Sequence, residues 1–216
     1  MAPGGAFVIE VPYLGQFLER NEYDTIYHEH LSYFAVRPLV ALLNRFGLRV
    51  EHVKLFPVHG GTIRVAVQHG DGYSAEVGEW LNQELKAGLA DRFTFGLLAA
   101  QAARNRHELK ARLTILKQQG KKVIGYGAPA KGTVCLNYCD IGTDLLPVVL
   151  DSTPAKQGLH VPGTHQPILP PSAFAEQNPD VLLLLAWNHA EEIIAREHAF
   201  RERGGQFLTP RLETLA

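Results

Sequence analysis

A tyrosine, two histidines and a glutamate occupy four consecutive positions, Tyr27-His28-Glu29-His30. Histidine exchanges protons near neutral pH, and carboxylate and phenol groups can assist it. The cluster lies between a strand-like and a helix-like segment, in the kind of connection that presents reactive groups from a rigid scaffold. Acid–base catalysis is one interpretation of this pattern. A polar loop whose side chains bond only to nearby backbone is the other.

The conformation of this loop decides which side chains act together. In an extended chain His28 and His30 share one side, and Tyr27 and Glu29 share the other. A helical turn instead pairs Tyr27 with His30. The sequence leaves both arrangements open. A metal site that combines the histidine pair with His59 is disfavoured because no closed ligand set appears, so we expect no metal.

Hydrophobic patterns predict the elements around the cluster. Residues 6–11 form a short apolar run after a glycine turn, which predicts a buried strand that opens the chain. Residues 39–46 show helical periodicity that ends at Gly47. Residues 50–56 and 62–67 alternate between apolar and polar side chains, which predicts two adjacent strands.

The rest of the chain predicts a helical connector and then an α/β unit. Helical composition runs from residue 74 to about 119, with apolar stripes at Leu85, Leu89, Phe93, Leu97, Ala100 and Leu113 to Leu116. Alternating strands and helices follow, an order that predicts a parallel sheet. The predicted strands are residues 123–126, 147–151, 181–186 and 206–208, with helices from about 133 and 189.

A loop of small residues after the first strand of this unit is a candidate anion site. Its glycines allow a close turn, and a helix start attracts anions. An acid ends the next strand, where nucleotide-binding folds hold a ribose, and an aromatic–amide pair ends a third. A packing turn with a solvated lysine is the alternative. The candidate substrate-binding residues are Gly125, Gly127, Ala128, Lys131, Asp151, Trp187 and Asn188.

Bulk composition excludes several classes of function. The net charge of -1 over 216 residues gives no electrostatic footprint for nucleic acid. Apolar runs are too short to span a membrane, and no secretory signal opens the chain. Cys135 and Cys139 are expected to be buried free thiols, which suits a cytoplasmic protein. Because the small-residue loop is not a strict G-x-G-x-x-G, an NAD-linked oxidoreductase is disfavoured.

Several segments together, in order along the chain, resemble the SAM-dependent C-methyltransferases of deoxysugar biosynthesis. The Tyr-His-Glu-His segment and the Gly-Tyr-Gly-Ala loop are the specific ones. The full set comprises residues 21–34, 59–65, 125–132, 152–158 and 186–188.

The resemblance implies a division of the chain. Family members begin with a cysteine-rich zinc lobe and the SAM-loop half of a class I methyltransferase sheet, and we expect both to be missing here. Residues 1–70 would be the C-terminal part of that sheet with the Tyr-His-Glu-His loop. Residues 71–119 would be the connector and 120–216 a Rossmann-like α/β domain. The chain alone is then not competent for SAM and needs a separate N-terminal SAM/zinc piece.

The resemblance also implies a reaction. Family members transfer a methyl group from SAM to the carbon next to the ketone of a nucleotide-linked 4-keto sugar. His30 is the candidate base and Tyr27 the next, while Glu29 and His28 would orient an imidazole. The other hypothesis is a non-catalytic module that binds a nucleotide sugar.

Overall fold

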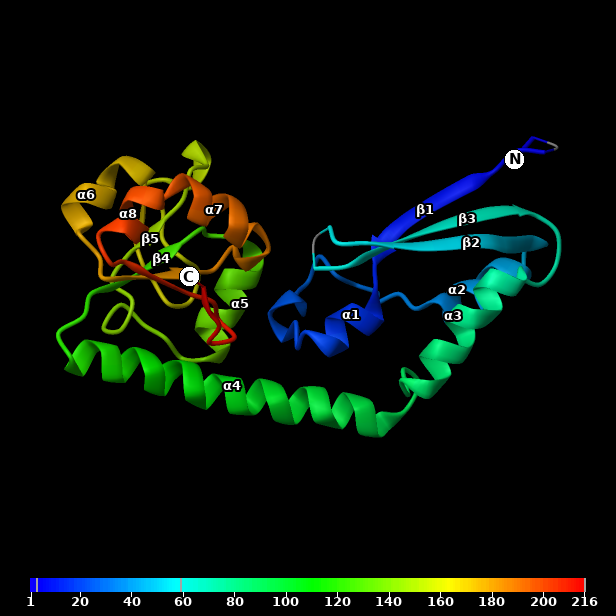
Figure 1. The fold of residues 1–216 in the computed structure, drawn as a ribbon, viewed down its shortest axis with the longest axis horizontal. Helices are drawn as coiled ribbons and strands as arrows, with labels where there is room; N and C mark the ends of the chain where they lie inside the picture. Colours follow the sequence, from blue (N-terminus) through cyan, green and yellow to red (C-terminus); the bar gives the residue numbers. More distant parts are fainter. Residues whose placement is uncertain (3, 59, 216) are drawn as a thin grey trace. The chain divides into compact units, whose positions relative to one another are not determined.

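The computed structural model describes residues 1–2, 4–58 and 60–215, with residue 215 described by its backbone only. The chain forms two compact units (Figure 1). Unit 1 comprises Met1–Tyr23 and Glu29–Ala100. Unit 2 comprises Asp24–His28 and the chain from Gln101 onward. Residues 24–28 of the loop that carries the acid–base cluster therefore belong to unit 2. The rest of that unit begins more than 70 residues further along the chain.

Unit 1 is a three-stranded antiparallel sheet with helices on one face. The sheet order is β1-β3-β2, with β1 Phe7–Pro12, β2 Leu48–Phe56 and β3 Thr62–His69. Helices α2 (Val36–Asn44) and α3 (Ala75–Lys86) cover it. The predicted strand, helix and hairpin are confirmed as elements. The expected burial of the first strand is wrong, because β1 is an edge strand and Phe7 and Val8 are exposed. Helix α1 (Leu14–Glu19) was not predicted, because six residues are too few to display a helical period. The core residues are Val36, Leu39, Val40, Leu43, Val50, Val53, Ile63, Val65, Val67 and Val77.

The predicted connector consists of two helices, α3 and the 27-residue α4 (Arg92–Gln118). The break between them contains Gly88, whose φ of +65° lies in the left-handed region. The helical prediction is confirmed, but the apolar stripes are buried only in part. Leu113 and Leu116 are in the core of unit 2, whereas Phe93 and Leu97 are 69% and 53% exposed. Periodicity predicts a helix, but burial also requires a packed partner surface.

Unit 2 contains a six-stranded sheet in the order β6-β5-β4-β7-β8-β9. The first five strands are parallel and β9 is antiparallel to β8. The predicted parallel α/β fold is therefore confirmed. The two-residue strands β6 and β9 were not predicted, since neither is long enough to show a pattern. The strands are β4 Val123–Tyr126, β5 Val149–Leu150, β6 Ile168–Leu169, β7 Val181–Leu184, β8 Gln206–Leu208 and β9 Thr214–Leu215.

Helices cover both faces of this sheet. In β7, Val181 and Leu183 face the core shared with α4 and α5 (Ala130–Tyr138). Leu182 and Leu184 face α6 (Phe174–Gln177), α7 (Ala190–Arg196) and α8 (His198–Glu202). Burial on both faces explains the continuous apolar run of β7. Short 3-10 turns η2 (Pro154–Lys156), η3 (Pro171–Ala173) and η4 (Trp187–His189) complete the unit, and Cys135 and Cys139 are buried free thiols, as predicted.

Candidate functional site

The loop between α1 and α2 is fixed to unit 1 near both ends. At its start the N–H of Glu22 donates to the carbonyl of Phe17 at 3.0 Å. At its end the N–H of Leu14 donates to the carbonyl of Phe34 at 2.7 Å. The intervening chain contains the short 3-10 turn η1 (Tyr23–Thr25) and then the acid–base cluster.

The cluster forms a turn and not an extended strand. His28 and Glu29 occupy the turn and are exposed, whereas Tyr27 and His30 are half-buried. The Tyr27 and His28 rings lie 6.3 Å apart between centroids. The cluster therefore has the turn of the second arrangement left open by the sequence, and the pairing of Tyr27 with His30 stays a prediction.

Asp24 attaches this loop to unit 2. The carboxylate is 1% exposed, and each of its oxygens accepts a hydrogen bond. The indole Nε1–H of Trp187 donates to Oδ2 at 2.6 Å, and Nη2 of Arg211 donates to Oδ1 at 2.9 Å. Burial raises the pKa of Asp24, while Arg211, Trp187 and the charge of Lys131 oppose that rise. Neither Asp24 nor Arg211 was predicted, since their partners lie 163 and 187 residues apart in the chain.

Two cationic side chains lie over the Trp187 ring. The guanidinium carbon of Arg211 lies 4.0 Å from the ring centroid and Nζ of Lys131 lies 4.5 Å from it. Both distances are within the range of cation–π attraction. The predicted residues Lys131 and Trp187 are thus brought together at the carboxyl end of β7, where open α/β sheets bind ligands.

The glycines of the small-residue loop are required by packing. A Cβ on Gly127 would lie 2.6 Å from Cβ of Ala186, and one on Gly125 would lie 2.8 Å from Cγ2 of Val149. Gly127 also has a φ of +83°. These contacts support the packing alternative for the glycines, independently of any ligand.

Asp151 holds the same loop closed. Its Oδ2 accepts the N–H of Ala128 at 2.6 Å and its Oδ1 accepts the N–H of Thr153 at 2.7 Å. Lys156 donates to the carbonyl of Ala128 at 3.0 Å and lies 3.6 Å from the carboxylate. Burial by itself would raise the pKa of Asp151, but these hydrogen bonds and the lysine charge lower it overall. The acid braces the loop with both oxygens.

Asn188 is the predicted residue with an uncommitted polar atom. Its Oδ1 is buried, and among the described residues it accepts no hydrogen bond. It belongs to η4, beside Trp187. A buried amide oxygen without a donor is costly, and a ligand donor would relieve that cost.

Among the residues that the structure describes, no three His, Cys, Asp or Glu side chains are grouped so that they could hold a metal ion. His59, the third histidine considered above, lies outside the described residues. Over the same residues, no helix is both long and apolar enough to cross a bilayer.

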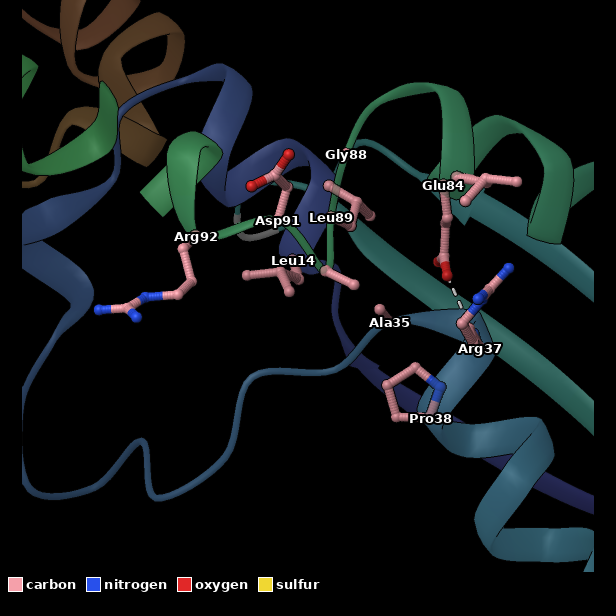
Figure 2. A pocket seen from close by; sticks show the side chains of 11 residues that line it. Leu14, Ala35, Arg37, Pro38, Glu84, Gly88, Leu89, Asp91 and Arg92 are labelled. Atoms are coloured by element: carbon pink, nitrogen blue, oxygen red, sulfur yellow. Dashed lines mark hydrogen bonds between the residues drawn. The ribbon is translucent and has the colours of Figure 1, made fainter. Parts of the chain in front are cut away.

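Figure 2 shows a separate pocket of about 580 Å³ within unit 1. Its polar end is Glu84, which is 3% exposed and accepts the N–H groups of Val36 and Arg37 at 2.6 and 2.9 Å. Because it accepts both N–H groups, Glu84 caps the N-terminus of α2. Burial, together with the Glu84 carboxylate, also raises the pKa of Tyr13. The pocket is lined by Leu14, Ala35, Arg37, Pro38, Glu84, Leu85, Gly88, Leu89, Ala90, Asp91 and Arg92.

Comparison with known proteins gives two matches. Residues 57–211 match the family described as the C-methyltransferase C-terminal domain. The chain is also 41% identical over 215 residues to the C-methyltransferase NovU of Streptomyces niveus. That alignment covers 97% of this chain and 51% of the relative, so the chain spans about half the length of the curated relative it matches.

Proposed function

Because the chain belongs to the family of C-methyltransferase C-terminal domains, we propose that it supplies the substrate-binding and proton-removing part of a SAM-dependent C-methyltransferase. The proposed substrate is a nucleotide-linked 4-keto deoxysugar. The methyl group of SAM is transferred to the carbon next to the ketone. That carbon loses one proton to a base, and S-adenosylhomocysteine is released.

The turn that half-buries Tyr27 and His30 and exposes His28 and Glu29 is the observation that carries this proposal. Proton loss next to a ketone yields an enolate, which requires a base and a hydrogen-bond donor at the oxygen. His30 is the proposed base. The Tyr27 hydroxyl is the proposed donor to the enolate oxygen. His28 and Glu29 are left with orienting roles.

Substrate binding is proposed for the carboxyl edge of the sheet in unit 2. Lys131 is in the first turn of α5, whose N-terminus favours a phosphate group. The uncommitted oxygen of Asn188 would accept a hydroxyl of the ligand. Gly125, Gly127, Ala128 and Asp151 would shape and hold this edge, since their close packing and hydrogen bonds already fix the loop.

The start of unit 1 has no loop of the kind expected for SAM binding. In unit 1, β1 leads into α1 through Pro12 and Tyr13, with no glycine loop that could approach a nucleoside. The space beside Gly15 is filled by the Tyr13 ring, 2.3 Å from where a Cβ would be. We therefore propose that SAM is held by a SAM/zinc piece N-terminal to these residues. In that arrangement residues 1–70 complete the SAM-binding domain, residues 71–119 connect it to the next domain, and residues 120–216 bind the substrate. The proposed location is the cytoplasm, where cysteine thiols stay reduced.

Proton exchange tests the proposal without SAM. The chain is incubated in deuterated water with thymidine-diphospho-4-keto-6-deoxyglucose, and loss of the proton on C-3, the carbon next to the ketone that is expected to be methylated, is followed by NMR. His30→Ala should slow exchange by about a hundredfold to ten-thousandfold, with ligand affinity unchanged. Tyr27→Phe tests the hydroxyl alone. His107→Ala, an exposed histidine on α4, is the matched control.

Each result distinguishes one interpretation from another. Exchange at the parent rate in His30→Ala would remove His30 as the base and make Tyr27 the leading candidate. If neither substitution changes the rate, the cluster is structural. If the parent binds the ligand and exchanges no proton, the non-catalytic binding module is favoured over the enzyme.

A further inference from the structure

The contacts of Asp24 point to a role that depends on the proposed function. Asp24 is three residues before Tyr27, and three residues of chain reach at most about 11 Å. Wherever Asp24 is fixed, the Tyr27 main chain is confined to that neighbourhood. The fixing partners are Trp187, at the carboxyl end of β7, and Arg211.

Arg211 is itself held from several directions. Its side chain is 14% exposed, against 2% for that of Asp24, and its guanidinium stacks on the Trp187 ring. Its backbone is in the turn between β8 and β9. The carbonyl of the preceding residue, Pro210, accepts Nδ2 of Asn105 from α4 at 2.9 Å. Asp24 therefore binds to a guanidinium that also lies over the Trp187 ring, on a turn that is itself bonded to α4.

Asp24 does not have the properties of a catalytic group. Both carboxylate oxygens are engaged and the residue is 1% exposed, so a substrate has no access to it. The indole N–H of Trp187 is likewise engaged. The hydrogen bond between these two side chains can influence a reaction only through the position of the loop.

We propose that Asp24 is a positioning residue, whose bonds to Trp187 and Arg211 hold Tyr27 at the ligand-binding edge of the sheet in unit 2. The same contact assigns Trp187 a second role besides any contact with a nucleotide sugar. Disorder of about 1 Å in a reacting group lowers turnover by about a hundredfold.

Two substitutions test this proposal. Asp24→Asn is isosteric and turns an amide NH₂ toward one of the two donors, so only one of the hydrogen bonds survives. Trp187→Phe keeps an aromatic ring but removes the N–H together with part of the indole face that Arg211 lies over. Asp180→Asn is the control: that carboxylate accepts the N–H of Lys122 at 2.8 Å, at the opposite end of β7.

The expected result is a slower rate of substrate proton exchange without a change in ligand affinity. Asp24→Asn should slow substrate proton exchange by about ten- to a hundredfold with unchanged ligand affinity, and Asp180→Asn should not. Trp187→Phe should slow exchange by a similar factor, and it is not used to judge affinity because Trp187 is itself a candidate substrate-binding residue. The double variant should be slowed by less than the product of the two single effects, because both substitutions disturb the same group of contacts. Amide hydrogen exchange of residues 25–28, by mass spectrometry, should rise at least about tenfold in both single variants.

Two outcomes would overturn the proposal. One is unchanged amide protection of residues 25–28 in Asp24→Asn; the other is increased amide exchange with substrate turnover at the parent rate. If Asp24→Asn does not fold, Trp187→Phe provides the same test. If the parent chain exchanges no substrate proton, the proposed function fails, and the amide measurement still decides whether Asp24 holds the loop.

Discussion

Gly127 provides a quantitative test of the packing at the small-residue loop. In Gly127→Ala the new Cβ would lie 2.6 Å from Cβ of Ala186, whereas carbon atoms pack at about 3.5–4.0 Å. The backbone at φ +83° adds a second cost for any side chain. The left-handed conformation costs about 1–2 kcal/mol and overpacking about 1–3 kcal/mol, so the free energy of unfolding should fall by about 2–5 kcal/mol.

Gly158→Ala separates the two costs. Gly158 has a nearly equal φ of +81°, lies in the same unit, and has no atom within 4 Å of the added Cβ. The backbone cost and the unfolded-state entropy effect of alanine then cancel between the two variants. The remaining difference, about 1–3 kcal/mol, is the steric cost of the approach to Ala186.

Guanidinium titration followed by the fluorescence of Trp187 measures this difference, in a Trp80→Phe background that leaves one tryptophan in unit 2. Adding Ala186→Gly to Gly127→Ala should recover part of the loss, because it removes the colliding carbon. Equal midpoints for Gly127→Ala and Gly158→Ala would refute the packing explanation. A conserved fold with weakened ligand binding in Gly127→Ala would instead assign this glycine to the ligand.

Four further outcomes are expected. Calorimetric titration of the chain alone should detect no SAM binding, and a micromolar affinity would show that the donor site is here. Trypsin should cut at the exposed Lys86 or Arg92 and leave a stable fragment with α4; rapid loss of that fragment would contradict the packing of α4 in unit 2. Glu84→Ala should lower stability by about 1–3 kcal/mol in thermal unfolding, since two N–H groups of α2 lose their acceptor, and an unchanged midpoint would exclude the cap. Because the pKa of Asp151 is below its ordinary 3.8, its stabilising contribution is present above that value and lost as pH falls through the lower folded-state pKa. Asp151→Asn should remove this contribution to the loss of folding stability at acid pH. An identical dependence of stability on pH in the two proteins would contradict a stabilising role of the ionised Asp151.

The elements of this fold could be predicted from local patterns, because each is defined by neighbours in the sequence. The alternation in residues 50–56 and 62–67 corresponds to β2 and β3, and the apolar run of residues 181–186 contains β7. Burial of the connector could not be predicted equally well. Phe93 and Leu113 have the same helical pattern, and only the second meets a packed sheet.

The candidate site was predictable in its residue types but not in its connections. Tyr27 and His30 stand out by composition, while the choice between a turn and an extended loop required coordinates. Asp24 could not be predicted from the sequence, because its proposed role rests on hydrogen bonds from Trp187 and Arg211, which lie far along the chain. Asp151 was expected to face a ribose, yet hydrogen bonds to local backbone occupy both its oxygens. Pairings of this kind are decided by tertiary packing.

The 163- and 187-residue separations also set the order of events during synthesis. A ribosome adds about 5–20 residues each second, so Asp24 is exposed for on the order of ten to forty seconds before its partners exist. Contacts of such sequence separation also form slowly, because a long loop must close first. The acid–base loop is therefore secured only after Trp187 and Arg211 have been synthesised. A nascent chain can hold a folded unit 1 long before it holds an ordered Tyr27.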